Sequence, residues 1–204
     1  MKAAVTTSNN EAAMTRVWEL KSDAVNDYAP LVFASNEEVA SGMFDTSGTP
    51  LAWPSRPKVE VFVEPGKRKP KPLADVSALT PGALAMSDKA KAAMGPFLSA
   101  FGQFLAMDCG EETRWFYNVT NLIPCIDESR STKRPSGSIV KEAFFEHAVP
   151  VEPAVFKDPL TAAASLYVND AGKAALEKIV AEAALMGVAF VEPGPPPKKP
   201  RPRS

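Results

Sequence analysis

The chain has 204 residues, of which 45% are hydrophobic and 23% charged, and its formal net charge is −1. A chain of this length buries roughly 70% of the surface that its unfolded form exposes, so we expect a substantial hydrophobic core. The average composition excludes collagen-like, coiled-coil and wholly disordered proteins. Two counts depart from the average, because the chain has a single histidine, His147, and 20 prolines.

Short strands are predicted in the first third of the chain. Residues 16–20 alternate in polarity and place Trp18 and Leu20 on one face, a pattern typical of a strand near a sheet edge. Residues 59–63 repeat this alternation until Pro65 ends it. We therefore expect two short strands in this part of the chain.

Two principal helices are predicted further along. Ser87 is a favourable N-cap, and the helix that follows it should stop or kink at Pro96, which has no backbone donor. Asn169 or Asp170 caps the clearest helix, which should run to about Met186. Four apolar residues of this helix recur at helical spacing and should form one buried stripe, namely Leu176, Ile179, Val180 and Ala183.

The second half of the chain is richer in strand signals. Aromatic, β-branched and alternating residues favour strands at residues 113–119, 138–145 and 166–168. Gly187 occupies a position where a left-handed residue would end the second helix, and residues 188–190 return as a closing strand. We expect either a parallel crossover or a helix folded back on the sheet. The predicted fold class is α+β, a mixed sheet of short strands with two main helices packed on it.

Charge is segregated along the chain at its proline-rich stretches. Residues 1–55 carry a net charge of −4, residues 56–72 carry +4, residues 73–193 carry −5 and residues 194–204 carry +4. We expect three parts: N-terminal strands with a basic proline-rich loop over 1–72, a main domain over 73–193, and a tail over 194–204. The basic, proline-rich tail has no apolar residue to bury, so it should be disordered.

Location and redox state are predicted from what the sequence lacks. The N-terminal residues contain no apolar run of the kind a signal peptide needs, and no segment approaches the ~20 apolar residues of a membrane span. We therefore expect a cytoplasmic protein without a membrane partner. Cys109 and Cys125 form no CxxC pair, so they are interpreted as reduced, semi-buried thiols.

Residues that could carry catalysis are few. A single histidine limits the chain to one imidazole-dependent site, and Glu146 could not orient the ring of His147 if both lay in a strand. Nucleotide-binding, hydrolase and zinc-protease motifs are absent from the sequence. By elimination, the sequence favours a binding protein over an enzyme and predicts neither a metal nor a cofactor.

Two alternatives from other classes also fit the sequence. A metal-dependent hydrolase or nuclease would use carboxylates such as Asp108, Glu111 and Asp127. A nucleic-acid adaptor would use the basic residues 67–71 and the tail, but four tail charges without aromatic residues make a weak footprint. We therefore expect no specific nucleic-acid partner.

One arrangement of residues points to a known family. The run from Trp115 to Val119, the apolar pair Leu122-Ile123 and the later helix follow one another over about residues 73–192. This order resembles the eleventh immunity-protein family of bacterial polymorphic toxin systems, formerly a domain of unknown function first noted in myxobacteria. The positions that carry the resemblance, mostly structural ones, are Trp115, Tyr117, Asn118, Asp127, Ser131, Phe156, Tyr167 and Gly187.

The resemblance implies a cytoplasmic antitoxin whose partner is a cognate toxin, delivered by type VI secretion or another contact-dependent route in bacterial competition. Such a protein blocks the toxin active site by stoichiometric binding and performs no catalysis. The acidic main domain fits this role, since many such toxins are nucleases with basic clefts and opposite charge speeds association.

Four acidic residues around the family motif are the expected contacts with the toxin: Glu111, Glu112, Asp127 and Glu128. Charge complementarity is the reason for choosing them. For Asp127 the alternative is a buried turn residue that accepts backbone hydrogen bonds.

Overall fold

A computed structural model describes residues 16–23 and 27–194. Its helices are α1 (Asn36–Ala40), α2 (Asp88–Leu98), α3 (Asp170–Glu182) and the 3₁₀ helix η1 (Glu146–Ala148). Its strands are β1 (Val17–Ser22), β2 (Leu31–Phe33), β3 (Val59–Val61), β4 (Val76–Ser77), β5 (Leu84–Met86), β6 (Gly102–Cys109), β7 (Glu112–Val119), β8 (Thr132–Lys133), β9 (Ile139–Lys141), β10 (Val155–Phe156), β11 (Tyr167–Asn169) and β12 (Val188–Val191). The α+β class is confirmed, and the strands are divided among several small antiparallel sheets.

β1 lies inside the first four-stranded sheet, whose order is β10-β11-β1-β12. It pairs antiparallel with β11 on one side and with β12 on the other. β11 and β12 therefore run parallel to each other, and α3 joins them as a crossover with β1 between them. Of the two expected arrangements, the structure has the crossover. β1 lies one strand in from the edge and is hydrogen-bonded on both sides.

The second four-stranded sheet, β4-β5-β7-β6, is built around a long hairpin. Its register runs from Gly102↔Val119 to Cys109↔Glu112, which leaves a two-residue turn. Gly110 in this turn has a φ of 60°, the left-handed conformation that two-residue hairpins favour. The strand predicted at residues 113–119 is confirmed as β7, and its partner β6 lies outside the predicted strands.

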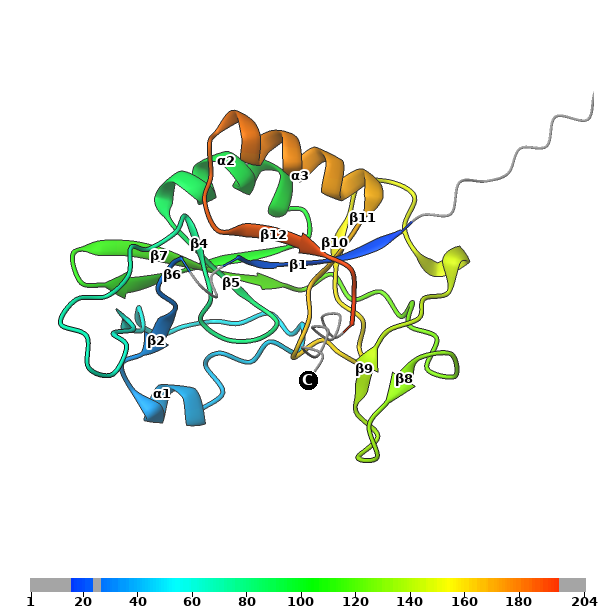
Figure 1. The fold of residues 1–204 in the computed structure, drawn as a ribbon, viewed down its shortest axis with the longest axis horizontal. Helices are drawn as coiled ribbons and strands as arrows, with labels where there is room; N and C mark the ends of the chain where they lie inside the picture. The colour runs from blue at the N-terminus through cyan, green and yellow to red at the C-terminus, as the bar shows by residue number, and fades with distance from the viewer. Residues whose placement is uncertain (1–15, 24–26, 195–204) are drawn as a thin grey trace, which may run out of the picture.

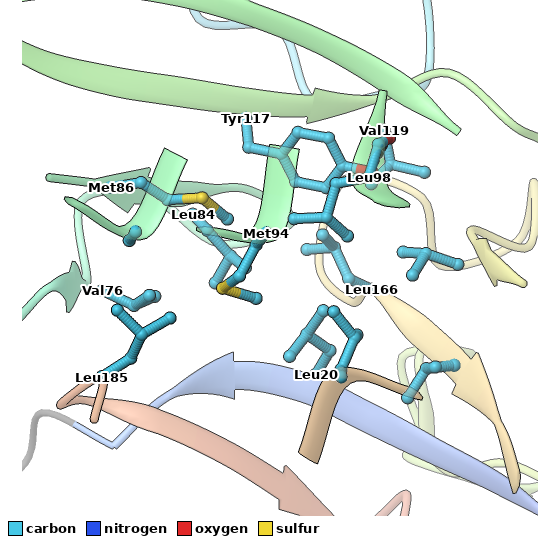
Figure 2. Packing of buried hydrophobic residues seen from close by; sticks show 14 residues of the cluster. Leu20, Val76, Leu84, Met86, Met94, Leu98, Tyr117, Val119, Leu166 and Leu185 are labelled. Carbon is cyan, nitrogen blue, oxygen red and sulfur yellow. Dashed lines mark hydrogen bonds between the residues drawn. The ribbon is translucent and has the colours of Figure 1, made fainter. Parts of the chain in front are cut away.

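Helices α2 and α3 lie together on one side of the two sheets (Figure 1). Figure 2 shows the main core that they enclose. Tyr117 of β7 reaches across this core, because its side chain is fully buried and its hydroxyl donates to the carbonyl of Leu98 at 2.9 Å. A buried hydroxyl with a partner avoids the cost of losing its hydrogen bonds to water.

Less regular segments pack on the strands away from the two helices. A second core holds Leu31 and Val59 against Phe116 of β7, and a third holds Cys125 against Tyr167 of β11. Together with the pairing of β1, these contacts join the first third of the chain to the rest. Residues on the two sides of the boundary predicted at residue 72 therefore share sheets and cores.

Helix α2 continues through Pro96 to Leu98, so a stop at this position, one of the two predicted outcomes, is wrong. Ser87 is its N-cap as predicted, because the Ser87 hydroxyl accepts from the N–H of Ala90 at 3.1 Å. Met94 and Leu98 are fully buried on either side of the proline. Burial of such a side chain contributes roughly 1.5–3 kcal/mol, so the two together offset the roughly 3 kcal/mol cost of an interior proline.

Helix α3 begins where the sequence predicts and ends earlier. Asn169 is the N-cap, since its side-chain oxygen accepts from the N–H of Gly172 at 2.8 Å. The helix ends at Glu182, not near Met186. Leu176 of the predicted stripe is fully buried, and the other three members are partly buried against the main core.

The left-handed residue after α3 is Ala184, with a φ of 45°, and not Gly187 as predicted. Gly187 also has a positive φ of 82°, but it serves the turn into β12. A Cβ at this position would collide with the carbonyl of Val76 and would lie 2.5 Å from the side chain of Ala74. The glycine is therefore required by both backbone conformation and close packing.

The predicted disordered tail lies outside the described residues from position 195 onward. Of the strand predicted at 138–145, the structure contains β9 over Ile139–Lys141. Within residues 16–23 and 27–194, no helix has the length and apolar character needed to cross a membrane.

A buried lysine connects the first sheet to the irregular segment that contains Thr46. Lys157 follows β10 and is fully buried, and its ammonium donates to the carbonyl of Thr46. Its backbone N–H donates to Asn121 at 2.9 Å, and its carbonyl accepts from Ile123 at 2.8 Å. Burial lowers the pKa of Lys157 to about 8, with a smaller opposing effect from Asp45.

The buried lysine predicts a pH-dependent stability. The unfolded chain holds this proton up to a pKa near 10.5, whereas the folded chain releases it near 8. The free energy of unfolding of the wild type should therefore rise relative to Lys157→Met across this interval, by about 3 kcal/mol. Urea unfolding from pH 7 to pH 10 measures the difference, with the exposed Lys178→Met as control. Parallel pH profiles of the wild type and Lys157→Met would contradict the prediction.

Candidate functional site

Two of the four predicted contact residues lie at the tip of the β6–β7 hairpin. Glu111 occupies the turn, and Glu112 opens β7. Glu111 is exposed, whereas Glu112 is paired with the buried guanidinium of Arg114 at 3.1 Å. The adjacent Asp108 is paired with Arg56 at 3.7 Å. The hairpin tip is therefore a surface of mixed charge.

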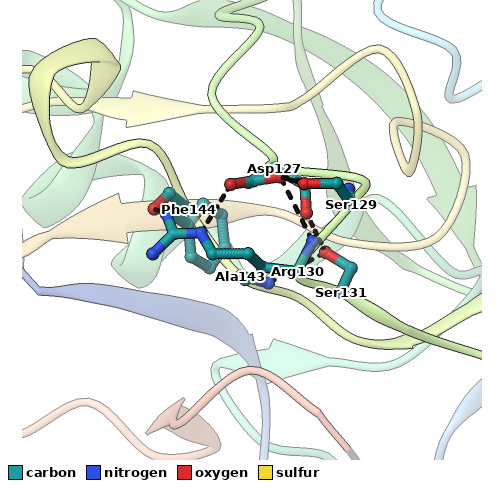
Figure 3. Close-up of polar contacts among 6 residues, drawn as sticks. All are labelled: Asp127, Ser129, Arg130, Ser131, Ala143 and Phe144. Carbon is teal, nitrogen blue, oxygen red and sulfur yellow. Dashed lines mark hydrogen bonds and ion pairs between the residues drawn. The ribbon is translucent and has the colours of Figure 1, made fainter.

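Asp127, one of the four expected toxin contacts, is buried, and its carboxylate is engaged within the protein. Its carboxylate accepts hydrogen bonds from the backbone and hydroxyl of Ser129 and from the backbone and guanidinium of Arg130 (Figure 3). These bonds lower its pKa to about 2. Ser131 closes the same turn by donating to the Asp127 carbonyl at 2.7 Å. The alternative considered for this residue, a turn residue that accepts backbone hydrogen bonds, describes the structure.

The predicted acidic contacts do not form one surface. Glu128 is exposed next to β8 and is paired with Lys133 at 2.6 Å, whereas Glu111 is at the hairpin turn on the opposite side of the molecule (Figure 1). The same separation keeps Asp127 away from Asp108 and Glu111, the set named for a metal-dependent hydrolase. Among the described residues, no three His, Cys, Asp or Glu side chains could hold a metal ion together.

The remaining candidates for chemistry are also placed by the structure. His147 is exposed in η1 and not at the end of a strand, and its ring lies 5.6 Å from that of Phe145. Cys109 and Cys125 are free and buried. Burial, with a smaller contribution from the nearby Asp158 carboxylate, raises the pKa of the Cys125 thiol to about 12. A thiol of this kind is inert as a nucleophile.

The residues that carry the resemblance noted in the sequence serve the packing of the protein. Trp115 donates to Asp88 at 2.6 Å, and the amide of Asn118 donates to the carbonyl of Thr49 at 2.8 Å. Phe156 and Tyr167 are fully buried and lie on neighbouring strands of the first sheet. The motif therefore defines the architecture and leaves the location of a binding surface to other residues.

An acidic pocket lies at the N-terminal end of β1. Its volume is about 280 Å³, and Glu142, Glu146 and Glu192 contribute the carboxylates. Trp18 and Phe144 contribute aromatic surface to its wall. The other lining residues are Arg16, Val17 and Pro193. Four separate segments thus converge on one concave surface: the start of β1, the segment after β9, η1 and the end of β12.

The carboxylates of this pocket have few partners among the described residues. Within the part of the chain that the structure describes, none of Glu142, Glu146 and Glu192 has an ion-pair partner within 4.0 Å. Oε1 of Glu142 accepts from the hydroxyl of Tyr167 at 3.2 Å, while Oε2 is buried and has no hydrogen-bond partner among the described residues. Among the described lining residues, three carboxylates face one guanidinium, that of Arg16, so this lining has an excess of negative charge.

The aromatic walls of the pocket are held in place. The indole N–H of Trp18 donates to Asp170 at 2.7 Å, and Lys173 lies over the indole ring at 4.7 Å. Phe144 packs edge-on against Tyr167 with ring centroids 5.3 Å apart. Carboxylates beside aromatic rings attract organic cations through charge and through cation–π contacts. The pocket is therefore suited to an ammonium or guanidinium group.

Sequence reasoning missed this pocket because its residues are far apart in the chain. Trp18 and Glu192 are 174 positions apart and become neighbours only through the pairing of β1 with β12. No local pattern distinguishes these glutamates from the rest. A second cavity, lined by Lys67, Lys69 and Lys71, lies at the other end of β1.

Comparison of the sequence with known protein families finds no matching family. No curated protein matches it either.

The engaged state of Asp127 predicts a role in stability. Asp127→Asn should lower the urea midpoint at pH 7, because the variant loses the charge that the guanidinium and the hydrogen-bond donors stabilise. A carboxylate with a lowered pKa stabilises the fold above its unfolded pKa near 3.8 and loses this effect as the pH falls towards 2. The difference in urea midpoint between Asp127→Asn and the wild type should therefore become smaller as the pH falls from 4 to 2.

The control for this experiment is Glu128→Gln, which removes the neighbouring but exposed carboxylate. Its midpoint should stay close to the wild-type value at every pH. An Asp127→Asn protein as stable as wild type at pH 7 would contradict the structural role.

Proposed function

We propose that the protein is an immunity protein, which neutralises a cognate toxin by stoichiometric binding. The observation that carries the proposal is the acidic, aromatic pocket at the N-terminal end of β1, whose carboxylates lack ion-pair partners among the described residues. A lysine or arginine side chain of the toxin enters this pocket. The order of the motif residues supports the immunity class, and neither catalysis nor a bound cofactor takes part in the inhibition.

The pocket favours a protein side chain because of its chemistry and shape. Its carboxylates are spread around about 280 Å³ and do not converge as a metal site requires. A guanidinium can hydrogen-bond to two carboxylates while its flat face packs against an aromatic ring. The alkyl part of the same side chain packs along the apolar wall. One basic residue thus satisfies both kinds of surface in the pocket.

Rigidity makes the pocket an efficient receptor. Trp18 lies on β1, and its indole N–H is hydrogen-bonded to Asp170. Phe144 packs against the ring of Tyr167, and its backbone forms an isolated β-bridge with Ile126. Binding therefore costs little ordering of the receptor side, so more of the contact energy is retained as affinity. The excess negative charge also increases the rate of encounter with a basic surface.

The immunity function predicts a stable complex with the product of the neighbouring toxin gene. Co-expression should give a copurifying one-to-one complex and should restore growth of cells that the toxin alone arrests. The measurement is size-exclusion chromatography with light scattering, together with a growth assay. Failure of the two proteins to associate at micromolar concentration would contradict the proposal.

The location of the contact is tested by charge removal. Glu146→Gln/Glu192→Gln should slow association with the toxin about tenfold at low salt, because steering depends on local charge. Glu37→Gln/Glu182→Gln removes the same charge elsewhere and should change the rate little. Glu111→Gln/Glu128→Gln tests the surface expected from the sequence. Stopped-flow measurements of the association rate as a function of salt distinguish the three variants. A larger decrease in rate for Glu111→Gln/Glu128→Gln than for Glu146→Gln/Glu192→Gln would contradict the assignment of the contact to the pocket.

A further inference from the structure

A second and larger cavity lies at the C-terminal end of β1. It has a volume of about 630 Å³, within the range of small-molecule sites in proteins. Ser22 at the end of β1 and Ala78 after β4 line it, and both residues also line a smaller adjoining cavity. The two cavities therefore adjoin each other.

One side of this cavity is apolar and is built on backbone hydrogen bonds. Tyr28 and Phe62 supply aromatic surface, and Ala29 and Pro30 lie between them. The N–H of Phe62 donates to the carbonyl of Pro30 at 3.0 Å, and the N–H of Ala29 donates to that of Pro72 at 3.0 Å. The first bond joins the two segments that form this wall, and the second connects the wall to the residue that follows Lys71.

The other side of the cavity is cationic. Lys67, Lys69 and Lys71 line it together with a single carboxylate, that of Glu64. Glu64 is paired with Lys71 at 2.6 Å, which lowers its pKa. Neither Lys67 nor Lys69 has an ion-pair partner within 4.0 Å in the described ranges. Two ammonium groups therefore remain to meet an anion.

The loop that carries these lysines has a defined turn. The N–H of Lys67 donates to the carbonyl of Glu64 at 3.0 Å, and Gly66 has the positive φ of 81° that the turn requires. The turn thus gives the lysine-bearing segment a fixed local geometry at the rim of the cavity. A basic run that the sequence alone assigns to a solvated loop becomes one wall of a partly open cavity.

We infer that this cavity binds a small amphiphilic anion, with its phosphate or carboxylate at Lys67 and Lys69 and its apolar body against Tyr28 and Phe62. Apolar walls with a few convergent charges are the usual composition of a ligand site. Charge complementarity selects the anionic head, and the aromatic wall rejects a bare inorganic ion. This site is separate from the acidic pocket and does not depend on the toxin.

The test uses the full chain and measures binding by isothermal titration calorimetry. Adenosine 5′-monophosphate and dodecyl phosphate are the two probes, because they share a phosphate head and differ in having a flat or an alkyl body. Adenosine and inorganic phosphate are the matching fragments. We expect at least one probe to bind about tenfold or more tightly than either of its parts, and the stronger probe identifies the body that the cavity prefers.

Matched variants assign the binding to the cavity. Lys67→Gln/Lys69→Gln should weaken the stronger probe about tenfold, and Phe62→Ser should weaken it while leaving the salt dependence unchanged. Lys133→Gln/Lys178→Gln removes two exposed charges elsewhere and should leave affinity unchanged.

Three results would overturn the inference. The first is that neither probe binds at millimolar concentration. The second is that inorganic phosphate binds as tightly as the probes. The third is that Lys133→Gln/Lys178→Gln loses as much affinity for the probe as Lys67→Gln/Lys69→Gln. Glu146→Gln/Glu192→Gln should bind the probe like wild type. A protein that fails to bind toxin but binds the probe would therefore refute the proposed function alone.

Discussion

The pairing of β1 with both β11 and β12 is the interaction on which the rest of the structure depends. It joins a strand near the start of the chain to two strands near its end, and loop closure over so many residues carries a large entropic cost. Burial of Leu20 of β1 with Leu176 of α3 in the main core offsets part of this cost. Once β1 is in place, α3 crosses over it and both candidate pockets acquire their walls.

β1 also separates opposite charges. Its first residues line the acidic pocket, and its last residue lines the lysine-bearing cavity. The net charge of −1 therefore conceals two local excesses of opposite sign at the two ends of one strand. Because the two cavities are apart, the two ligands that we propose, a cationic side chain and an organic anion, would not compete for one site.

The acidic residues of the protein divide into those that hold the fold and those that remain available. Asp127 and Asp158 are buried, and their carboxylates accept backbone hydrogen bonds, Asp158 from Cys125 and Ile126 at 2.7 Å each. Glu146 and Glu192 are exposed at a concave surface without such partners. The first group consists of aspartates and the second of glutamates, and their surroundings differ as well, because the first pair is buried and hydrogen-bonded and the second is exposed.

Local elements could be predicted from the sequence, because caps and periodicity act within a few residues. Such elements are the Ser87 cap, the strand β7, and a helix that begins at Asn169 or Asp170. The sequence left open whether that helix crosses over or folds back on the sheet, and the pairing of β1 with β11 and β12 decided for the crossover. The sequence did not determine that α2 continues past Pro96, since burial of Leu98 against distant strands outweighs a local rule. It also did not determine the pockets. Trp18, Glu142 and Glu192 come together through sheet pairing between distant segments, and the basic run at Lys67 becomes a cavity wall only when Tyr28 and Phe62 pack beside it. Long-range contacts decide these features, and a linear pattern does not encode them.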